Sequence, residues 1–127
     1  MLERDQKSIA QRFQIPDWRL MVSWLRSLNY VRNVIAHHGR LWNLNLSVNP
    51  KIPRPGQIPD FDPSLPLNAA RIYSVCCLLC FLTRVINPKS HWLEEARTLF
   101  AHFPAMPHAA IQDMGFPADW QTQSLWQ

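Results

Sequence analysis

The apolar and polar residues between Pro16 and Asn43 recur with the period of an amphipathic helix. At about 100° per residue, six apolar side chains share one stripe: Met21, Trp24, Leu28, Val31, Ile35 and Trp42. Polar or small side chains share a second stripe, with Arg32 at its edge: Asn29, Asn33, Ala36, His37 and Arg40. The pattern predicts a long helix that begins near Pro16 or Asp17 and ends near His38, or as late as Trp42.

Further helices are predicted on both sides of this long one. Residues 3–13 form a short amphipathic pattern, residues 67–86 are apolar almost all round, and Ser90 caps a helix that runs to about residue 102. A last short helix is predicted near residues 108–114, and the aromatic tail at 116–126 is expected to pack on the bundle. The fold class is therefore all-α, a bundle of four to five helices with these residues in one core: Leu28, Val31, Ile35, Leu78, Leu79 and Leu82.

A proline-rich loop interrupts the helical patterns. Six of the 11 prolines fall between Pro50 and Pro66, a density that excludes regular helix or strand. At 127 residues the chain is predicted to form one domain, 1–127, with 45–66 as its loop. A loop of this length either covers a site or contacts a substrate, or it is an extended crossover between distant helices.

The basic residues are distributed unevenly. The net charge is +4, and no Asp or Glu occurs between Trp18 and Pro59. Within that stretch Arg19, Arg26, Asn33 and Arg40 recur every seven residues, so a continuous helix carries them on one slowly drifting stripe. Such a cationic segment attracts polyanions, although a solvated helix face has the same pattern.

Cysteine usage and hydropathy indicate a cytoplasmic chain. Cys76, Cys77 and Cys80 lie on one apolar helix, where they are expected to be reduced core residues and not a metal site. Residues 1–13 lack the apolar region of a signal peptide, and the apolar run at 72–82 is too short to span a bilayer. No membrane association, metal or cofactor is predicted.

The segment RNVIAHHGRLWN at residues 32–43 holds an arginine, a polar residue and a histidine in R-x4-H spacing: Arg32, Asn33 and His37, with His38 as an alternative. It resembles the signature of the bacterial abortive-infection (Abi) proteins, in the branch related to HEPN ribonucleases. The MGFPADW segment at Met114–Trp120 is also similar to the family's C-terminal segment. The resemblance extends over nearly the whole chain, and since family members are usually longer at the N-terminus, the chain resembles the C-terminal part of one.

The resemblance implies a HEPN-like bundle that cleaves RNA without a metal or cofactor, in phage defence or as a toxin. The 2′-hydroxyl attacks the adjacent phosphate and leaves a cyclic phosphate and a 5′-hydroxyl. By this resemblance His37 moves a proton as general base or acid, and Arg32 stabilises the charge on the phosphorane oxygens. Asn33 orients the imidazole or holds a phosphate oxygen. Four arginines are expected to contact RNA phosphates: Arg19, Arg26, Arg40 and Arg54.

One helix supplies a single acid or base, whereas this reaction uses both. A homodimer is therefore expected to complete the site, and an antitoxin or regulatory partner is a further possibility.

His38 lies about 100° from His37, towards the apolar stripe, and is expected to be a structural histidine bonded within the bundle. The His37–His38 pair also fits a packed polar corner with no chemistry. The alternatives to an enzyme are a non-catalytic module that binds RNA or a partner, as a truncated remnant of the family, and a purely helical interaction domain.

Overall fold

The described part of the computed structural model, residues 2–61, 67–103 and 110–127, contains helices and no strand. Four are α-helices: α1 (Glu3–Arg12), α2 (Trp18–Ala36), α3 (Ile72–Ile86) and α4 (Trp92–Ala101). Three short 3₁₀ helices follow: η1 (Ile111–Met114), η2 (Trp120–Thr122) and η3 (Ser124–Trp126). The all-α prediction is confirmed. The last predicted helix is the 3₁₀ turn η1, and residues 108–109 of that prediction lie outside the described residues.

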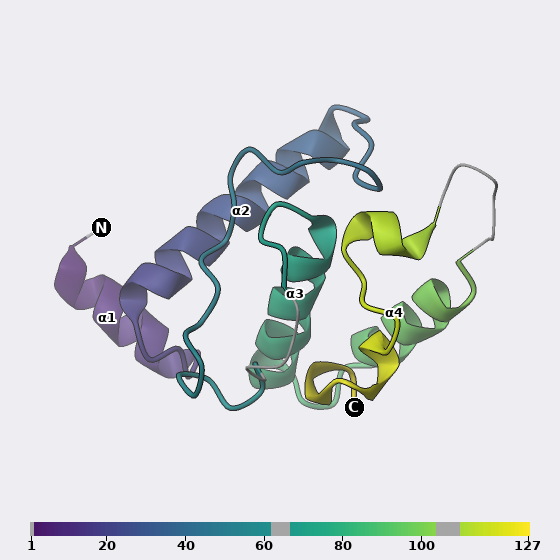
Figure 1. Cartoon of the computed structure of the whole chain (residues 1–127). Helices are drawn as coiled ribbons and strands as arrows, with labels where there is room; N and C mark the ends of the chain where they lie inside the picture. Colours follow the sequence, from purple (N-terminus) through teal and green to yellow (C-terminus); the bar gives the residue numbers. More distant parts are fainter. Residues whose placement is uncertain (1, 62–66, 104–109) are drawn as a thin grey trace.

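The helix α3 stands at the centre, with α1 and α2 on one side and α4 with the C-terminal tail on the other (Figure 1). Nine of its residues are buried, from Ile72 to Phe81, which confirms that the most apolar segment forms the most buried helix. It begins at Ile72 and not at the predicted residue 67, because the carbonyl of Ala70 accepts the backbone N–H of Leu46 (2.8 Å) instead of a helical donor. No helix in the described ranges is long and apolar enough to cross a membrane.

Five of the six predicted core residues pack in the core. Val31 and Leu78 are buried, and Leu28, Leu79 and Leu82 pack against them half-buried. Ile35 is 56% exposed, so its predicted burial is wrong. Eleven residues after the buried Trp24, Ile35 lies only about 20° from it around the helix. Its exposure therefore comes from its place in the last turn of α2, where no element among residues 2–61, 67–103 and 110–127 covers that face.

The three cysteines lie inside α3, as the sequence predicted. All are buried and free, and burial raises the pKa of the Cys76 thiol to about 12. Burial also raises the pKa of Cys77 and of Cys80. The thiols therefore stay protonated at neutral pH, which makes them apolar packing groups and poor nucleophiles.

The C-terminal tail closes the bundle beside α3 and α4. Trp126 is fully buried and its ring centroid lies 4.9 Å from that of Trp120. Its indole N–H donates to the Tyr73 hydroxyl (3.2 Å), and Arg84 donates to the carbonyls of Leu125 and Gln127 (3.2 Å each). The predicted packing of the aromatic tail is confirmed.

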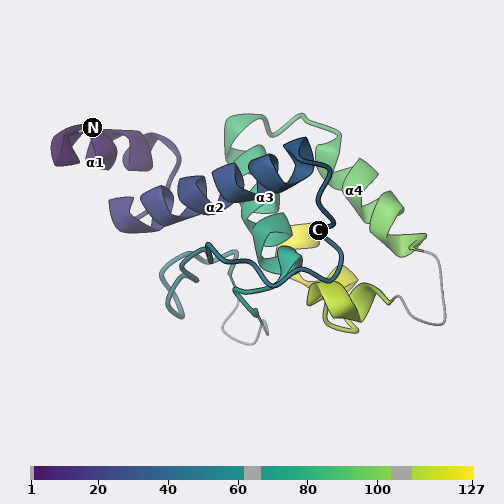
Figure 2. The same ribbon diagram turned by 90° about the horizontal axis from the view of Figure 1, so that it is seen from above.

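The segment after α2 turns back and runs alongside that helix (Figures 1 and 2). Its backbone is held by side chains of α2, which donate or accept at these points: Ser27 Oγ to Val48 O (3.0 Å), Trp24 Nε1 to Lys51 O (2.8 Å) and Lys51 N to Ser23 Oγ (2.8 Å). Residues 50–61 contain no regular element, as predicted; residues 62–66 of the predicted loop lie outside the described residues. Through residue 51 the segment therefore runs back antiparallel to α2; contact with a substrate and an extended crossover both stay predictions.

Candidate functional site

The predicted catalytic motif lies at the C-terminal end of α2. The helix starts cleanly because Asp17 accepts the backbone N–H of Arg19 (2.9 Å) as N-cap. It ends at Ala36, with His37 as the C-cap residue. The predicted extension to His38 or Trp42 is therefore wrong by two or more residues.

A hydrogen-bonded Schellman motif ends α2. The N–H of Gly39 donates to the carbonyl of Val34 (2.7 Å), and the N–H of His38 donates to that of Ile35 (3.0 Å). His38 occupies the left-handed position, with φ 58°, which glycine usually takes in this motif. Gly39 follows because a Cβ there would lie 2.6 Å from Val34 Cγ1 and 2.9 Å from Val34 O.

This turn decides where the two histidines point. His37 keeps a backbone bond to the Asn33 carbonyl (3.1 Å) and its side chain is exposed. The side chain of His38 is exposed as well, so the expectation of a structural histidine bonded within the bundle is wrong. The prediction assumed that His38 continues the helix, about 100° from His37. Because His38 has a left-handed backbone conformation, its side chain points in a different direction from that of a helical residue.

The side chains of Arg32 and Asn33 interact directly. Arg32 Nη1 donates to Asn33 Oδ1 (3.1 Å), and both residues are exposed. Asn33 therefore contacts Arg32 here, where the sequence suggested the imidazole or a phosphate oxygen as its partner. Arg32, Asn33 and His37 together present a guanidinium, an amide and an imidazole on an open surface at the helix end.

The residues after the motif fasten it to the rest of the bundle. Trp42 Nε1 donates to the Ala110 carbonyl (3.1 Å), and Arg71 Nη1 donates to Asn43 Oδ1 (3.1 Å). These bonds connect the chain just beyond the motif to η1 and to the start of α3. The RLWN part of the signature thus has a packing role in this fold.

The four arginines expected to bind RNA do not form one row. Arg19 and Arg26 lie on α2, whereas Arg40 follows the end of the helix and Arg54 lies in the proline-rich loop; all four are exposed. The predicted seven-residue stripe is wrong at Arg40, since the helix has ended four residues earlier. Arg19 and Arg26 instead line one groove together with Lys51, a residue of the segment that follows α2.

A groove of about 390 Å³ separates α2 from the returning segment. We call it the α2 groove; its lining includes these six residues: Trp18, Arg19, Arg26, Val48, Asn49 and Lys51. Lys51 is 25 residues beyond Arg26, so only the fold could show that it joins the arginines. In the sequence, the one sign that Lys51 could bind an anion was its place in the stretch without carboxylates. The sequence gave no such sign for Trp18.

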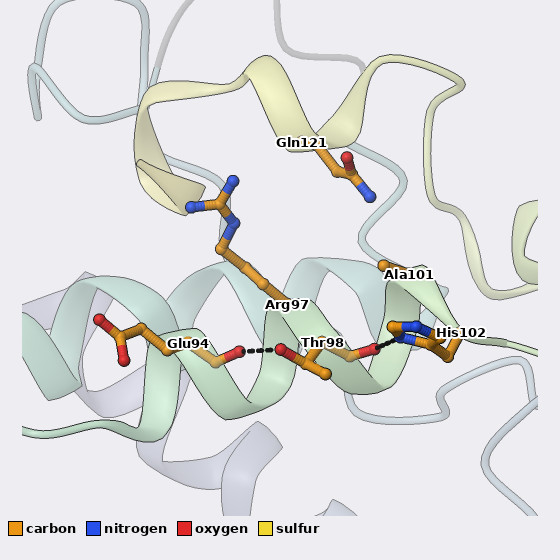
Figure 3. A pocket seen from close by; sticks show the side chains of 6 residues that line it. All are labelled: Glu94, Arg97, Thr98, Ala101, His102 and Gln121. Atoms are coloured by element: carbon orange, nitrogen blue, oxygen red, sulfur yellow. Dashed lines mark hydrogen bonds between the residues drawn. The ribbon is translucent and has the colours of Figure 1, made fainter.

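A second hollow, of about 350 Å³, lies between α4 and η2 (Figure 3). Arg97 and Gln121 extend towards it from the two sides, and His102 Nδ1 bonds the Thr98 carbonyl (2.8 Å) on α4. It contains none of the motif residues. In the described ranges, no three His, Cys, Asp or Glu side chains lie together as a metal site would require.

Comparison with known proteins bears on the first third of the chain. Residues 1–43 match a family model described as Abi-like protein. This match covers α1, α2 and the whole RNVIAHHGRLWN segment, and it stops at Asn43, so it lends no support to the resemblance at Met114–Trp120. Searches of curated proteins and of solved structures gave no significant match.

The left-handed His38 leads to a stability prediction. Replacing His38 with glycine is expected to raise the free energy of unfolding by about 0.5–1 kcal/mol, because the left-handed backbone costs an L-residue energy that exceeds the entropy glycine gains on unfolding. Replacing Gly39 with alanine is expected to lower it by about 1–3 kcal/mol, because the new methyl group meets Val34. Urea unfolding followed by circular dichroism measures both. Equal effects of the two changes would contradict the Schellman assignment.

Proposed function

We propose that this protein is an Abi-like, HEPN-type endoribonuclease that works without a metal ion, in phage defence or as a toxin. One observation carries the proposal: Arg32, Asn33 and His37 are all exposed at the C-terminal end of α2, inside the segment that matches the Abi-like model. The surrounding stretch has no carboxylate between Trp18 and Pro59, which favours binding of a polyanionic substrate.

The three side chains suit transesterification of RNA. An imidazole ordinarily titrates near neutral pH and can take the proton of the 2′-hydroxyl, or give one to the leaving 5′-oxygen. As the O2′–P bond forms and the P–O5′ bond breaks, negative charge grows on the phosphorane oxygens, where the Arg32 guanidinium stabilises it. The contact from Asn33 Oδ1 holds that guanidinium in place. The products are a 2′,3′-cyclic phosphate and a 5′-hydroxyl.

A homodimer through α2 would supply the second histidine. One chain offers one His37, and the reaction needs an acid and a base. A two-fold dimer that pairs the C-terminal ends of the two α2 helices would bring Arg32, Asn33 and His37 of both subunits together around one phosphate. Arginines facing each other repel, so bound RNA should strengthen the dimer.

The second candidate is a non-catalytic module that binds RNA or a protein partner, such as an antitoxin. The observation that favours it is the exposure of all three motif side chains in one chain, since catalytic acids and bases usually work where water is excluded. In this case the arginines keep a binding role and His37 has none.

Incubation of the purified protein with a mixed single-stranded RNA pool in excess EDTA tests the proposal. Cleavage is expected to persist, and mass spectrometry is expected to show a 2′,3′-cyclic phosphate at the 3′ end of each 5′ fragment and a 5′-hydroxyl on each 3′ fragment. Intact RNA with a verified dimer would reject the ribonuclease and favour the binding module. Intact RNA only in EDTA, with cleavage when Mg²⁺ is present, would reject the metal-independent reaction.

A further inference from the structure

Three cationic residues from two segments line the α2 groove. Arg19 and Arg26 are seven residues apart on α2, about 20° from each other around the helix and roughly 10 Å apart along it. The backbone of Lys51 is held level with the part of α2 between the two arginines, because its N–H donates to Ser23 Oγ (2.8 Å) and its carbonyl accepts from Trp24 (2.8 Å). The fold thus brings a third cationic residue to the groove that both arginines line.

The three cationic residues of the groove differ in whether acidic side chains lie near them. No carboxylate lines it, and in the described ranges Arg26 and Lys51 form no ion pair. Arg19 lies nearer to acids: Lys7, and to a smaller extent Arg19, lower the pKa of Glu3.

An aromatic surface lies at one end of the groove. The Arg19 guanidinium is 5.2 Å from the centroid of the half-buried Trp18 ring. Indole and guanidinium planes both provide faces on which a nucleic-acid base stacks. At the other end the groove runs towards the motif, since His37 lies eleven residues after Arg26 and only about 20° from it around the helix axis.

We propose that the α2 groove binds single-stranded RNA along α2, with backbone phosphates on Arg19, Arg26 and Lys51 and one base stacked at Trp18. The strand leaves the groove in the direction of Asn33 and His37. The inference rests on the proposed function for the identity of the ligand, and it adds the path that the ligand takes. The hydrogen bonds that hold residues 48–51 against α2 keep the groove open without RNA, so little ordering cost accompanies binding.

Binding of a labelled oligouridine by the full chain carrying His37→Ala measures the groove apart from cleavage. The double variant Arg26→Gln/Lys51→Gln is expected to bind at least tenfold more weakly, and the slope of log K against log[salt] is expected to fall by roughly 1.4, because two phosphate contacts are lost. The matched control Lys89→Gln/Arg97→Gln removes the same charge elsewhere and is expected to change binding less than twofold. Equal weakening by both doubles overturns the proposal.

Trp18→Leu separates stacking from charge. It keeps an apolar side chain in the half-buried position and is expected to weaken binding about tenfold with the salt slope unchanged. Unchanged affinity, or tighter binding of duplex RNA than of the single strand by the parent protein, overturns the proposal. Circular dichroism melting confirms that each variant is folded.

The two proposals can fail independently. If the groove variants lose oligouridine binding while the wild type cuts no RNA, the ribonuclease is rejected and the groove stands. If the wild type cuts RNA while the groove variants bind oligouridine as the parent does, the groove is rejected and the ribonuclease stands.

Discussion

Replacing His37 with alanine is expected to lower the rate of RNA cleavage by about 10²–10⁴-fold, the usual contribution of a positioned acid or base. The fold should not change, because His37 is exposed and follows the last residue of α2. Single-turnover cleavage of a labelled RNA at saturating protein measures the chemical step alone. Thermal melting of the same sample shows whether the fold is retained.

The control for this variant is His91→Ala. That imidazole is exposed, and its only recorded ion pair in the described ranges is with Glu94 on α4 (3.6 Å), far along the chain from the motif. Its loss should leave cleavage within twofold of wild type. Cleavage by the His37→Ala protein at the wild-type rate would remove His37 from the mechanism and favour His38 as the catalytic histidine.

Arg32→Ala is expected to reduce cleavage by a similar factor, since it removes the positive charge that meets the phosphorane. Mixing the inactive Arg32→Ala and His37→Ala proteins, under conditions in which subunits exchange, should give cleavage above that of either variant alone and below that of wild type. The mixed dimer regains one Arg32 and one His37 on different subunits, but it holds one His37 where the wild-type site holds two. If mixing restores nothing although mixed dimers form, the site is not shared between subunits.

The second large effect concerns the tail. Trp126→Ala is expected to lower the free energy of unfolding by about 3–5 kcal/mol, a large share of the 5–15 kcal/mol typical of a whole domain. The indole is fully buried among the rings of these residues: Tyr73, Phe100, Phe116 and Trp120. Its removal leaves a cavity and takes away the donor to the Tyr73 hydroxyl. Chemical denaturation followed by far-UV circular dichroism gives the change.

Two further variants, Trp126→Phe and Leu99→Ala, serve as controls for Trp126→Ala. Trp126→Phe keeps most of the packing and loses the N–H, so a cost of about 1–2 kcal/mol is expected. Leu99→Ala removes a side chain that is 68% exposed and should cost less than about 0.5 kcal/mol. If Trp126→Ala unfolds at the wild-type midpoint, the tail does not belong to the cooperative core. The result also bears on function, because this tail lies outside the segment that matches the Abi-like model.

Much of the helical fold followed from local chemistry. The period of the apolar residues placed α2, and the all-round apolar character of residues 67–86 placed α3 except for its start, because burial of a continuous face is what stabilises a helix in a bundle. Ser90, whose hydroxyl accepts the backbone N–H of Trp92 (3.1 Å), predicted the start of α4. Prolines excluded regular structure after α2. Each of these signals acts within a few residues.

The candidate site was only partly predictable, because sequence signals of this kind act within a few residues. The identities of Arg32, Asn33 and His37 came from the sequence, but the end of α2 came from the turn in which His38 adopts a left-handed conformation and Gly39 packs on Val34. A histidine at that position gives a weaker local signal than glycine does. The predicted places of His38 and Arg40 were therefore wrong.

By itself, the sequence determined that this chain is helical, where most of its helices lie to within a few residues, and which cationic and imidazole side chains it carries. Only the tertiary structure decided that Ile35 is exposed, that the tail packs around Trp126, and that Lys51 lies beside Arg26 in a groove. The physical reason is range. Periodicity and capping depend on bonds between residues three or four apart, whereas the groove depends on Ser23, Trp24 and Ser27 binding a backbone more than twenty residues away. No local pattern encodes that pairing.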